Sequence, residues 1–170
     1  VFINSQSPLF VHRNRSYTVF GSSYTFECDG KKSTRNLHFD WKVYLRGSVQ
    51  ALKSVSVNPR EFKLPAYSLV VGELYSVTLT VRHLESLKSS TATMQLFVVT
   101  GSIVCVVSGG YDLGMRIDGS AVIDLSSSYD EDIESAFGSN ADLKFNFECN
   151  RILPSYSSVC GLLMEHISPD

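Results

Sequence analysis

The chain has 170 residues, of which 44% are hydrophobic and 19% charged, and its formal net charge at pH 7 is −2. This charge provides no basic surface for nucleic acid, and no apolar run reaches the roughly 18 residues of a membrane-spanning helix. We therefore expect no nucleic-acid partner and no direct membrane insertion in this segment, which is long enough for one large domain or two small ones.

The first hundred residues are dominated by alternation of apolar and polar side chains, which is typical of half-buried β-strands. The pattern is strongest in LHFDWKVYL, where Trp41 lies on the apolar, inward parity. The expected strands cover residues 22–28, 37–45, 52–57, 62–65, 75–82 and 88–100. Several short strands separated by turn signals predict a β-sandwich of the immunoglobulin or fibronectin type III kind.

A tyrosine follows a Leu-x-x-Gly turn in LVVGELY and then leads a strictly alternating strand. In such sandwiches a Tyr near the start of the sixth strand bonds back to the upstream backbone, an arrangement called the tyrosine corner. We assign this role to Tyr75, the turn to Gly72 and a core position to Leu69. These three residues are predicted to be structural.

The first unit also has a cysteine and a tryptophan, Cys28 and Trp41, at the spacing of immunoglobulin strands B and C. Antibody-type domains place their second core cysteine two residues after the corner tyrosine, where this chain has Val77. The inter-sheet disulfide therefore cannot form, and the fibronectin-like form is favoured.

From Gly101 the strand pattern begins again, over residues 102–110, 114–125 and 143–149. The last of these repeats residues 37–43, with Phe147 in place of Trp. We divide the chain into a fibronectin/immunoglobulin-like sandwich over residues 1–100 and a second sandwich over residues 101–170. The second copy lacks the tyrosine motif and a final strand, so we expect a truncated fold, either a fragment or one that a neighbouring molecule completes.

Four cysteines suit an oxidising compartment. Cys149 and Cys160 flank a short loop, and we expect them to form a local disulfide, which by chain entropy contributes about 2–3 kcal/mol. Cys28 and Cys105 either pair with each other or stay free. Asn14 begins Asn-Arg-Ser, an acceptor motif for N-glycosylation that agrees with secretion.

The turn SSSYDEDIE invites a calcium site, because Asp130, Asp132 and Glu134 are oxygen ligands at alternate positions. An EF-hand counted from Asp130 would need Gly and Glu where Ser135 and Ala141 stand. The favoured alternative is a solvated loop. Apart from this weak calcium candidate, we expect no cofactor.

No catalytic group is expected. The histidines His12, His38, His83 and His166 are scattered, no nucleophile elbow occurs, and GGYDLG lacks the Lys-Ser/Thr of a phosphate loop. The chain is therefore predicted not to be an enzyme. Exposed aromatic side chains could stack on sugar rings, and the candidates are Tyr17, Tyr44, Tyr111 and Tyr156.

Five stretches follow one another along the chain: LPAYSLVVGELYSVTLTV, SSTATMQLFVV, VVSGG, IDGSAVIDLSSSYDED and LKFNFEC followed by a further Cys. Taken together, they resemble the REJ (receptor for egg jelly) module of sea-urchin sperm receptors and polycystin-type membrane proteins. The resemblance covers residues 37–161 in order. The chain departs from the family at Phe147, where Trp is usual, and at DED, where Asp-Pro-Asp is common. The resemblance implies tandem fibronectin- and PKD-like sandwiches outside the membrane, often on ciliary or flagellar surfaces.

The expected function is that of a non-catalytic extracellular module of a cell-surface, ciliary REJ/polycystin-like protein, serving as spacer and protein-interaction platform. Its partners would be other extracellular domains or subunits of a larger assembly. Two alternatives remain open: a structural subunit of an extracellular ciliary filament, and a carbohydrate-binding module with a glycan as partner.

Overall fold

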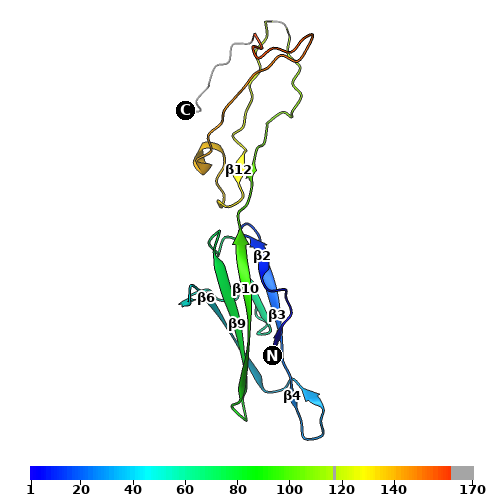
Figure 1. Cartoon of the computed structure of the whole chain (residues 1–170), viewed down its shortest axis with the longest axis vertical. Coiled ribbons are helices and arrows are strands. Elements are labelled where there is room, and N and C mark those ends of the chain that lie inside the picture. The colour runs from blue at the N-terminus through cyan, green and yellow to red at the C-terminus, as the bar shows by residue number, and fades with distance from the viewer. Residues whose placement is uncertain (117, 162–170) are drawn as a thin grey trace.

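The computed structural model describes residues 1–116 and 118–161, and in these ranges the chain is all-β, with one short 3₁₀ turn and no α-helix. The molecule is elongated, and two parts follow one another along its long axis (Figure 1). We call residues 1–100 the first unit, and residues 101–116 together with 118–161 the second unit. The last strand of the first unit is β10, and the first strand of the second unit is β11.

The larger sheet of the first unit has five strands in the order β2-β10-β9-β6-β7. They are β2 (Leu9–His12), β6 (Leu37–Leu45), β7 (Ser48–Gln50), β9 (Leu74–His83) and β10 (Ser89–Val99). Strands β6, β9 and β10 pair antiparallel over nine residues at each step, whereas β2 runs parallel to β10 at the edge. The alternation of the sequence therefore becomes one buried and one solvated face.

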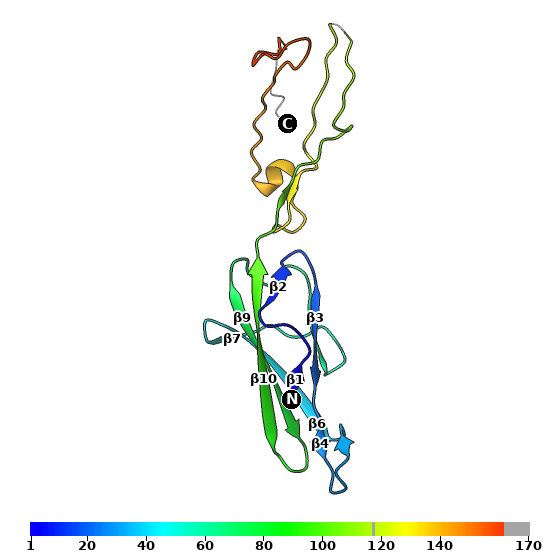
Figure 2. The ribbon, with the colours of Figure 1, turned by 45° about the vertical axis from the view of Figure 1, so that its right-hand side comes forward.

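The smaller sheet has the order β1-β3-β8, formed by β1 (Phe2–Ile3), β3 (Tyr17–Ser22) and β8 (Glu61–Leu64). A separate hairpin of β4 (Thr25–Phe26) and β5 (Lys32–Ser33) extends from the end of the first unit that lies farthest from the second (Figure 1). The turned view shows β3 facing β9 and β10 across the core (Figure 2).

The two sheets pack face to face, because one continuous cluster contains buried side chains of both. Burying each large apolar side chain contributes about 1.5–3 kcal/mol. The buried members are Val19, Val43, Phe62, Leu64, Leu69, Tyr75, Val77, Met94, Leu96 and Val98. The prediction of an all-β fold is confirmed, and a two-sheet sandwich describes the first unit.

The second unit has little regular structure among its described residues: β11 (Ile103–Val104), β12 (Tyr129–Asp130) and the 3₁₀ turn η1 (Gly138–Ala141). Within it, only Ser128, Gly138 and Ala141 are buried. Many large apolar side chains are exposed, among them Tyr111, Val122, Phe137, Phe145, Phe147, Ile152 and Leu153. This part of the chain does not form a closed sandwich of its own.

Five expected strands are corrected by the structure. Residues 102–110 contribute only the short β11, and the described residues of 114–125 form no strand, apart from an isolated bridge between Ser108 and Asp124. Residues 143–149 alternate in sequence but form no strand, because no neighbouring segment pairs with their backbone in the described part of the chain. Residues 22–28 contribute only the last residue of β3 and the short β4, and residues 52–57 stay irregular apart from a bond from the Val55 N–H to the Lys63 carbonyl (2.9 Å). The sandwich instead uses β3, which the alternation pattern had not singled out.

Candidate functional site at the junction of the two units

The junction is built from the chain that leaves β10 and an acidic turn that follows β12. The N–H of Gly101 donates to Asp132 Oδ2 at 2.8 Å, and the N–H of Ser102 donates to Glu131 Oε2 at 2.9 Å. In return, the Glu131 N–H donates to the Ser102 carbonyl at 3.1 Å. Hydrogen bonds to a carboxylate contribute roughly 1.5–3 kcal/mol each, more than neutral ones. We call these residues the junction clamp.

A turn of the first unit joins the clamp. Asn14 lies between β2 and β3, and its Nδ2 donates to Glu131 Oε1 at 3.1 Å. Glu131 thus accepts one bond from the connecting backbone and another from the sandwich itself. A single carboxylate therefore ties both units together.

Gly101 has to be small at this position. A Cβ there would lie 2.8 Å from Glu131 Cβ and 2.9 Å from Asp132 Oδ1, closer than ordinary van der Waals contact. The bare glycine backbone is what lets the acidic turn approach the connecting chain.

Four buried polar atoms near this end of the first unit have no hydrogen-bond partner among the described residues. They are Arg13 Nε, Asn14 Oδ1, Tyr17 OH and Asp132 Oδ1. Burial raises the pKa of the Tyr17 phenol above its usual range, and the nearby Tyr75 raises it further. The junction is thus the part of the molecule where packing leaves polar groups unmatched.

The three calcium candidates are not brought together as a set. Asp130 Oδ1 accepts the Asp132 N–H at 2.8 Å, Asp132 accepts from Gly101, and Glu134 is exposed. Across residues 1–116 and 118–161, no group of three or more His, Cys, Asp or Glu side chains could hold a metal ion. Calcium binding at this turn stays a prediction. Sequence reasoning passed over Glu131, although it lies between Asp130 and Asp132 in the same turn.

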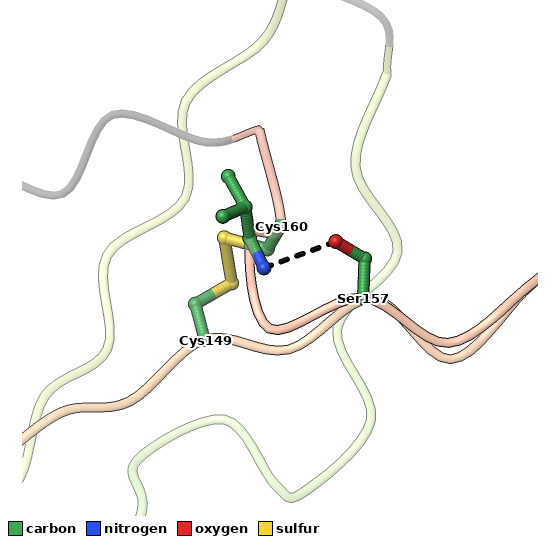
Figure 3. Close-up of a disulfide and its surroundings, with 4 residues drawn as sticks. Cys149, Ser157 and Cys160 are labelled. Atoms are coloured by element: carbon green, nitrogen blue, oxygen red, sulfur yellow. Dashed lines mark hydrogen bonds between the residues drawn. A yellow bond between two sulfur atoms is a disulfide. The ribbon is translucent and has the colours of Figure 1, made fainter.

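The Cys149–Cys160 disulfide is confirmed, with the two Cα atoms 5.5 Å apart. Inside the closed loop, Arg151 and Ser157 exchange two backbone hydrogen bonds of 2.9 Å. The Ser157 hydroxyl also accepts the Val159 N–H at 3.2 Å (Figure 3). The bridge orders a small loop at the far end of the second unit.

The pairing of Cys28 with Cys105 is wrong, since both are free and exposed. Cys28 follows β4 in the hairpin at one end of the molecule, whereas Cys105 follows β11 in the second unit (Figure 1). A disulfide needs Cα atoms within about 7 Å, whereas the first unit lies between the β4–β5 hairpin and the β11–β12 pair (Figure 1). Cys28 therefore also does not occupy the core position of an immunoglobulin strand B.

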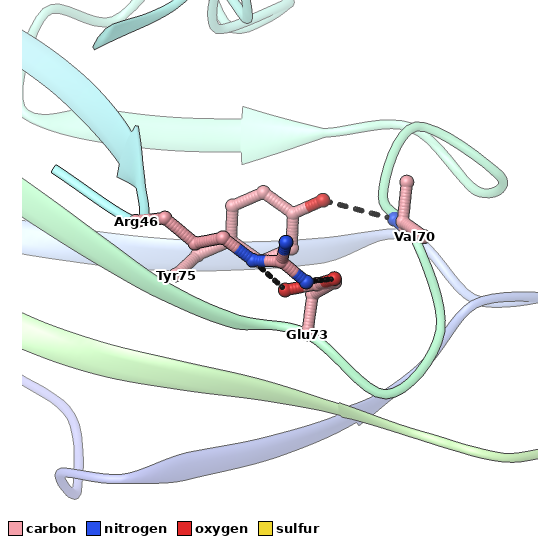
Figure 4. A network of polar contacts seen from close by, with 4 residues as sticks. All are labelled: Arg46, Val70, Glu73 and Tyr75. Atoms are coloured by element: carbon pink, nitrogen blue, oxygen red, sulfur yellow. Dashed lines mark hydrogen bonds and ion pairs between the residues drawn. The ribbon is translucent and has the colours of Figure 1, made fainter. Parts of the chain in front are cut away.

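The predicted structural residues lie where the tyrosine-corner interpretation requires. Tyr75 is 3% exposed, and its hydroxyl oxygen accepts the Val70 N–H at 3.0 Å, while Glu73 pairs with Arg46 beside it (Figure 4). Gly72 has a φ of +78°, the left-handed region that favours glycine. Trp41 stacks on Phe62 with ring centroids 5.5 Å apart.

The three described histidines lie on the larger sheet, His12 in β2, His38 in β6 and His83 in β9. His12 and His38 are exposed on the larger sheet, His83 Nδ1 accepts the Ser86 N–H at 3.1 Å, and His166 lies outside the described residues. Of the aromatic candidates for glycan stacking, Tyr111 and Tyr156 are 85% and 71% exposed, whereas Tyr17 and Tyr44 are partly buried.

An open hollow of about 440 Å³ lies at the other end of the first unit, between the β4–β5 hairpin and the β9–β10 turn. Its walls combine an exposed aromatic ring, Phe26, with the charged side chains of Arg35, Glu85 and Lys88. None of the predicted glycan-stacking tyrosines lines it, and carbohydrate binding stays a prediction.

Compared with family models, curated proteins and solved structures, the chain gives no match. Across the described ranges, no helix is both long and apolar enough to cross a membrane.

Proposed function

We propose that this chain is a non-catalytic extracellular module of an REJ/polycystin-like surface protein, located on the cell surface and in particular on cilia. In this proposal the first unit is a fibronectin type III-like sandwich and the second a PKD-like unit, and the pair serves as spacer and interaction platform. The two-sheet core, the hydrogen bond between Tyr75 and Val70, and the disulfide in the second unit support it.

The junction clamp is the observation that carries the spacer function. A spacer has to transmit direction as well as distance, so its consecutive units need more than a flexible connection. Here the connecting backbone bonds to Glu131 and Asp132, and Asn14 adds a bond from the sandwich. Three charge-assisted bonds at one short connection favour a fixed angle between the units.

Small-angle scattering on the full chain tests this proposal. We expect the wild type to scatter as a single elongated particle. Gly101→Ala should broaden the distribution of shapes, because the added Cβ pushes against the acidic turn. Gly114→Ala is the matched control, since nothing lies within 4 Å of a Cβ there. Wild-type scattering that fits only a wide range of inter-unit angles would contradict the spacer function.

The surface location has its own test. An antibody raised against residues 1–100 should label intact, unpermeabilised cells that make the protein, with staining enriched on cilia where these are present. Labelling that appears only after permeabilisation would exclude the extracellular location.

A structural filament subunit is the second candidate, favoured by residues 143–149. This segment alternates yet lacks a strand partner in the described chain, and Phe145 and Phe147 remain 37% and 38% exposed. A neighbouring subunit that adds a strand would satisfy its backbone and cover its rings. In this case the chain should assemble as its concentration rises. Phe145→Ser should prevent assembly, while Asn146→Ser should not.

A further inference from the structure

The glycosylation motif and the junction share a side chain. Asn14-Arg15-Ser16 is an acceptor sequence for N-linked glycans, and the acceptor atom would be Asn14 Nδ2. In the folded chain this nitrogen donates to Glu131 Oε1 at 3.1 Å. A carboxylate can only accept, so the contact identifies which side of the Asn14 carboxamide faces the second unit.

The surroundings of the Asn14 carboxamide oxygen disfavour an attached sugar. Asn14 Oδ1 is buried from solvent and has no hydrogen-bond partner among the described residues. A glycosylated Asn side chain is a secondary amide, whose favoured trans form puts the sugar carbon on the same side as the oxygen. The first sugar ring would thus have to occupy space beside an oxygen that solvent does not reach.

We propose that a glycan on Asn14 and the closed junction clamp exclude each other, so that glycosylation releases the second unit from the first. The transfer replaces one Nδ2–H bond by a bond from Nδ2 to C1 of N-acetylglucosamine. The proton leaves to solvent, and the diphosphate carrier of the donor departs. The ring displaces Glu131, and because Asp132 is the next residue, the bonds to Gly101 and Ser102 open with it.

This inference requires the junction clamp and exposure of the chain to the glycosylation machinery. It does not depend on which partner the chain binds. Its control variant is Ser16→Ala, which abolishes the acceptor motif but leaves the Asn14 carboxamide intact. Ser16 is exposed, so this substitution should not disturb the fold. Both chains are secreted from the same eukaryotic host, and intact mass reports whether Asn14 carries a glycan.

Hydrogen exchange of the Gly101 and Ser102 amides then measures the state of the junction. We expect both amides to exchange about tenfold faster or more in the glycosylated chain than in Ser16→Ala. Trimming the glycan to one N-acetylglucosamine should keep exchange fast, because the first ring is the part that displaces Glu131. Asn14→Ala, which removes the hydrogen bond without adding bulk, should cause a smaller increase.

Equal protection in the glycosylated chain and in Ser16→Ala would overturn the proposal. An unmodified Asn14 in the secreted wild type would do so as well, since no glycan would then be present to act. If the amides of Asn14→Ala exchanged as fast as those of the glycosylated chain, loss of the hydrogen bond and not the bulk of the sugar ring would control the junction.

Discussion

Tyr17 and Tyr75 contribute phenol groups to the same core region, yet in the described chain only the hydroxyl of Tyr75 has a hydrogen-bond partner. The Tyr75 oxygen accepts the Val70 N–H at 3.0 Å, whereas the Tyr17 hydroxyl is buried without one. The two residues are close enough for Tyr75 to raise the pKa of Tyr17. This contrast separates a hydroxyl that stabilises the fold from one that does not.

Replacing each tyrosine by phenylalanine should therefore have opposite consequences. Tyr75→Phe removes the acceptor of the Val70 N–H, and we expect it to lower the free energy of unfolding by about 1–2 kcal/mol. Tyr17→Phe removes an unmatched buried hydroxyl and should be neutral or slightly stabilising. Urea unfolding of both variants against the wild type measures the difference. Equal losses in the two variants would contradict it.

Alkaline pH should reveal the buried state of Tyr17. Its pKa in the folded chain is raised above the unfolded value of about 10, because the fold holds the phenol neutral. Ionisation of Tyr17 therefore costs no stability below pH ~10, and stability is lost as pH rises further. Above pH 10 the wild type should thus lose stability faster than Tyr17→Phe, by at most about 1.4 kcal/mol per pH unit. Urea titrations at pH 8, 10 and 11 with blocked thiols test this, and parallel curves would refute it.

Gly21 should tolerate no side chain. It is buried in β3, and a Cβ would collide with the Leu79 side chain and lie 2.9 Å from Trp41 Cζ2. We expect Gly21→Ala to destabilise the first unit by about 1–3 kcal/mol through overpacking. Gly114→Ala, in open space, should stay within about 0.5 kcal/mol of the wild type. Thermal or chemical unfolding measures both, and similar stabilities would show that the core adapts.

The thiols should divide into two classes. Cys28 and Cys105 are free and exposed, while Cys149 and Cys160 are joined. A maleimide reagent should add two labels to the native, unreduced protein and four after reduction. Peptide mapping should find the first two labels on Cys28 and Cys105. A native protein that takes up no label would be evidence for a disulfide between these two residues.

Calcium should have little effect on the melting temperature, because the carboxylates of the acidic turn already accept hydrogen bonds from backbone amides. We expect the same melting temperature in millimolar calcium and in EDTA. Asp132→Ala should lower stability by about 1–3 kcal/mol in both, since it removes the acceptor of the Gly101 N–H. Glu134→Ala, at an exposed position, should change neither curve. A calcium-dependent rise in melting temperature that Asp132→Ala abolishes would establish a metal site.

Local sequence rules were sufficient for the strongest elements of the first unit. The alternation around Trp41 and along the strand that follows Tyr75 became β6 and β9, because burial on one face depends only on side-chain parity. The turn at Gly72 and the fold-back of the Tyr75 hydroxyl also follow from a short motif. The Cys149–Cys160 bridge needed only a short loop between its ends.

Alternation proved insufficient where a strand needs a distant partner. Residues 143–149 have as clear a pattern as β6, yet they pair with no strand in the described part of the chain, because backbone hydrogen bonds depend on what lies beside a segment in space. For the same reason the edge strand β2 was missed, since its parallel pairing with β10 joins residues far apart in the chain.

Residue types alone determined that this chain folds as layered β-structure, that Tyr75 closes a corner and that one disulfide is local. Only the tertiary structure decided what Asn14, Gly101 and Glu131 do, because they lie far apart in the chain and meet through packing of two units. Periodicity records which side of a strand is buried, but it holds no information on which loop will face which turn across a junction.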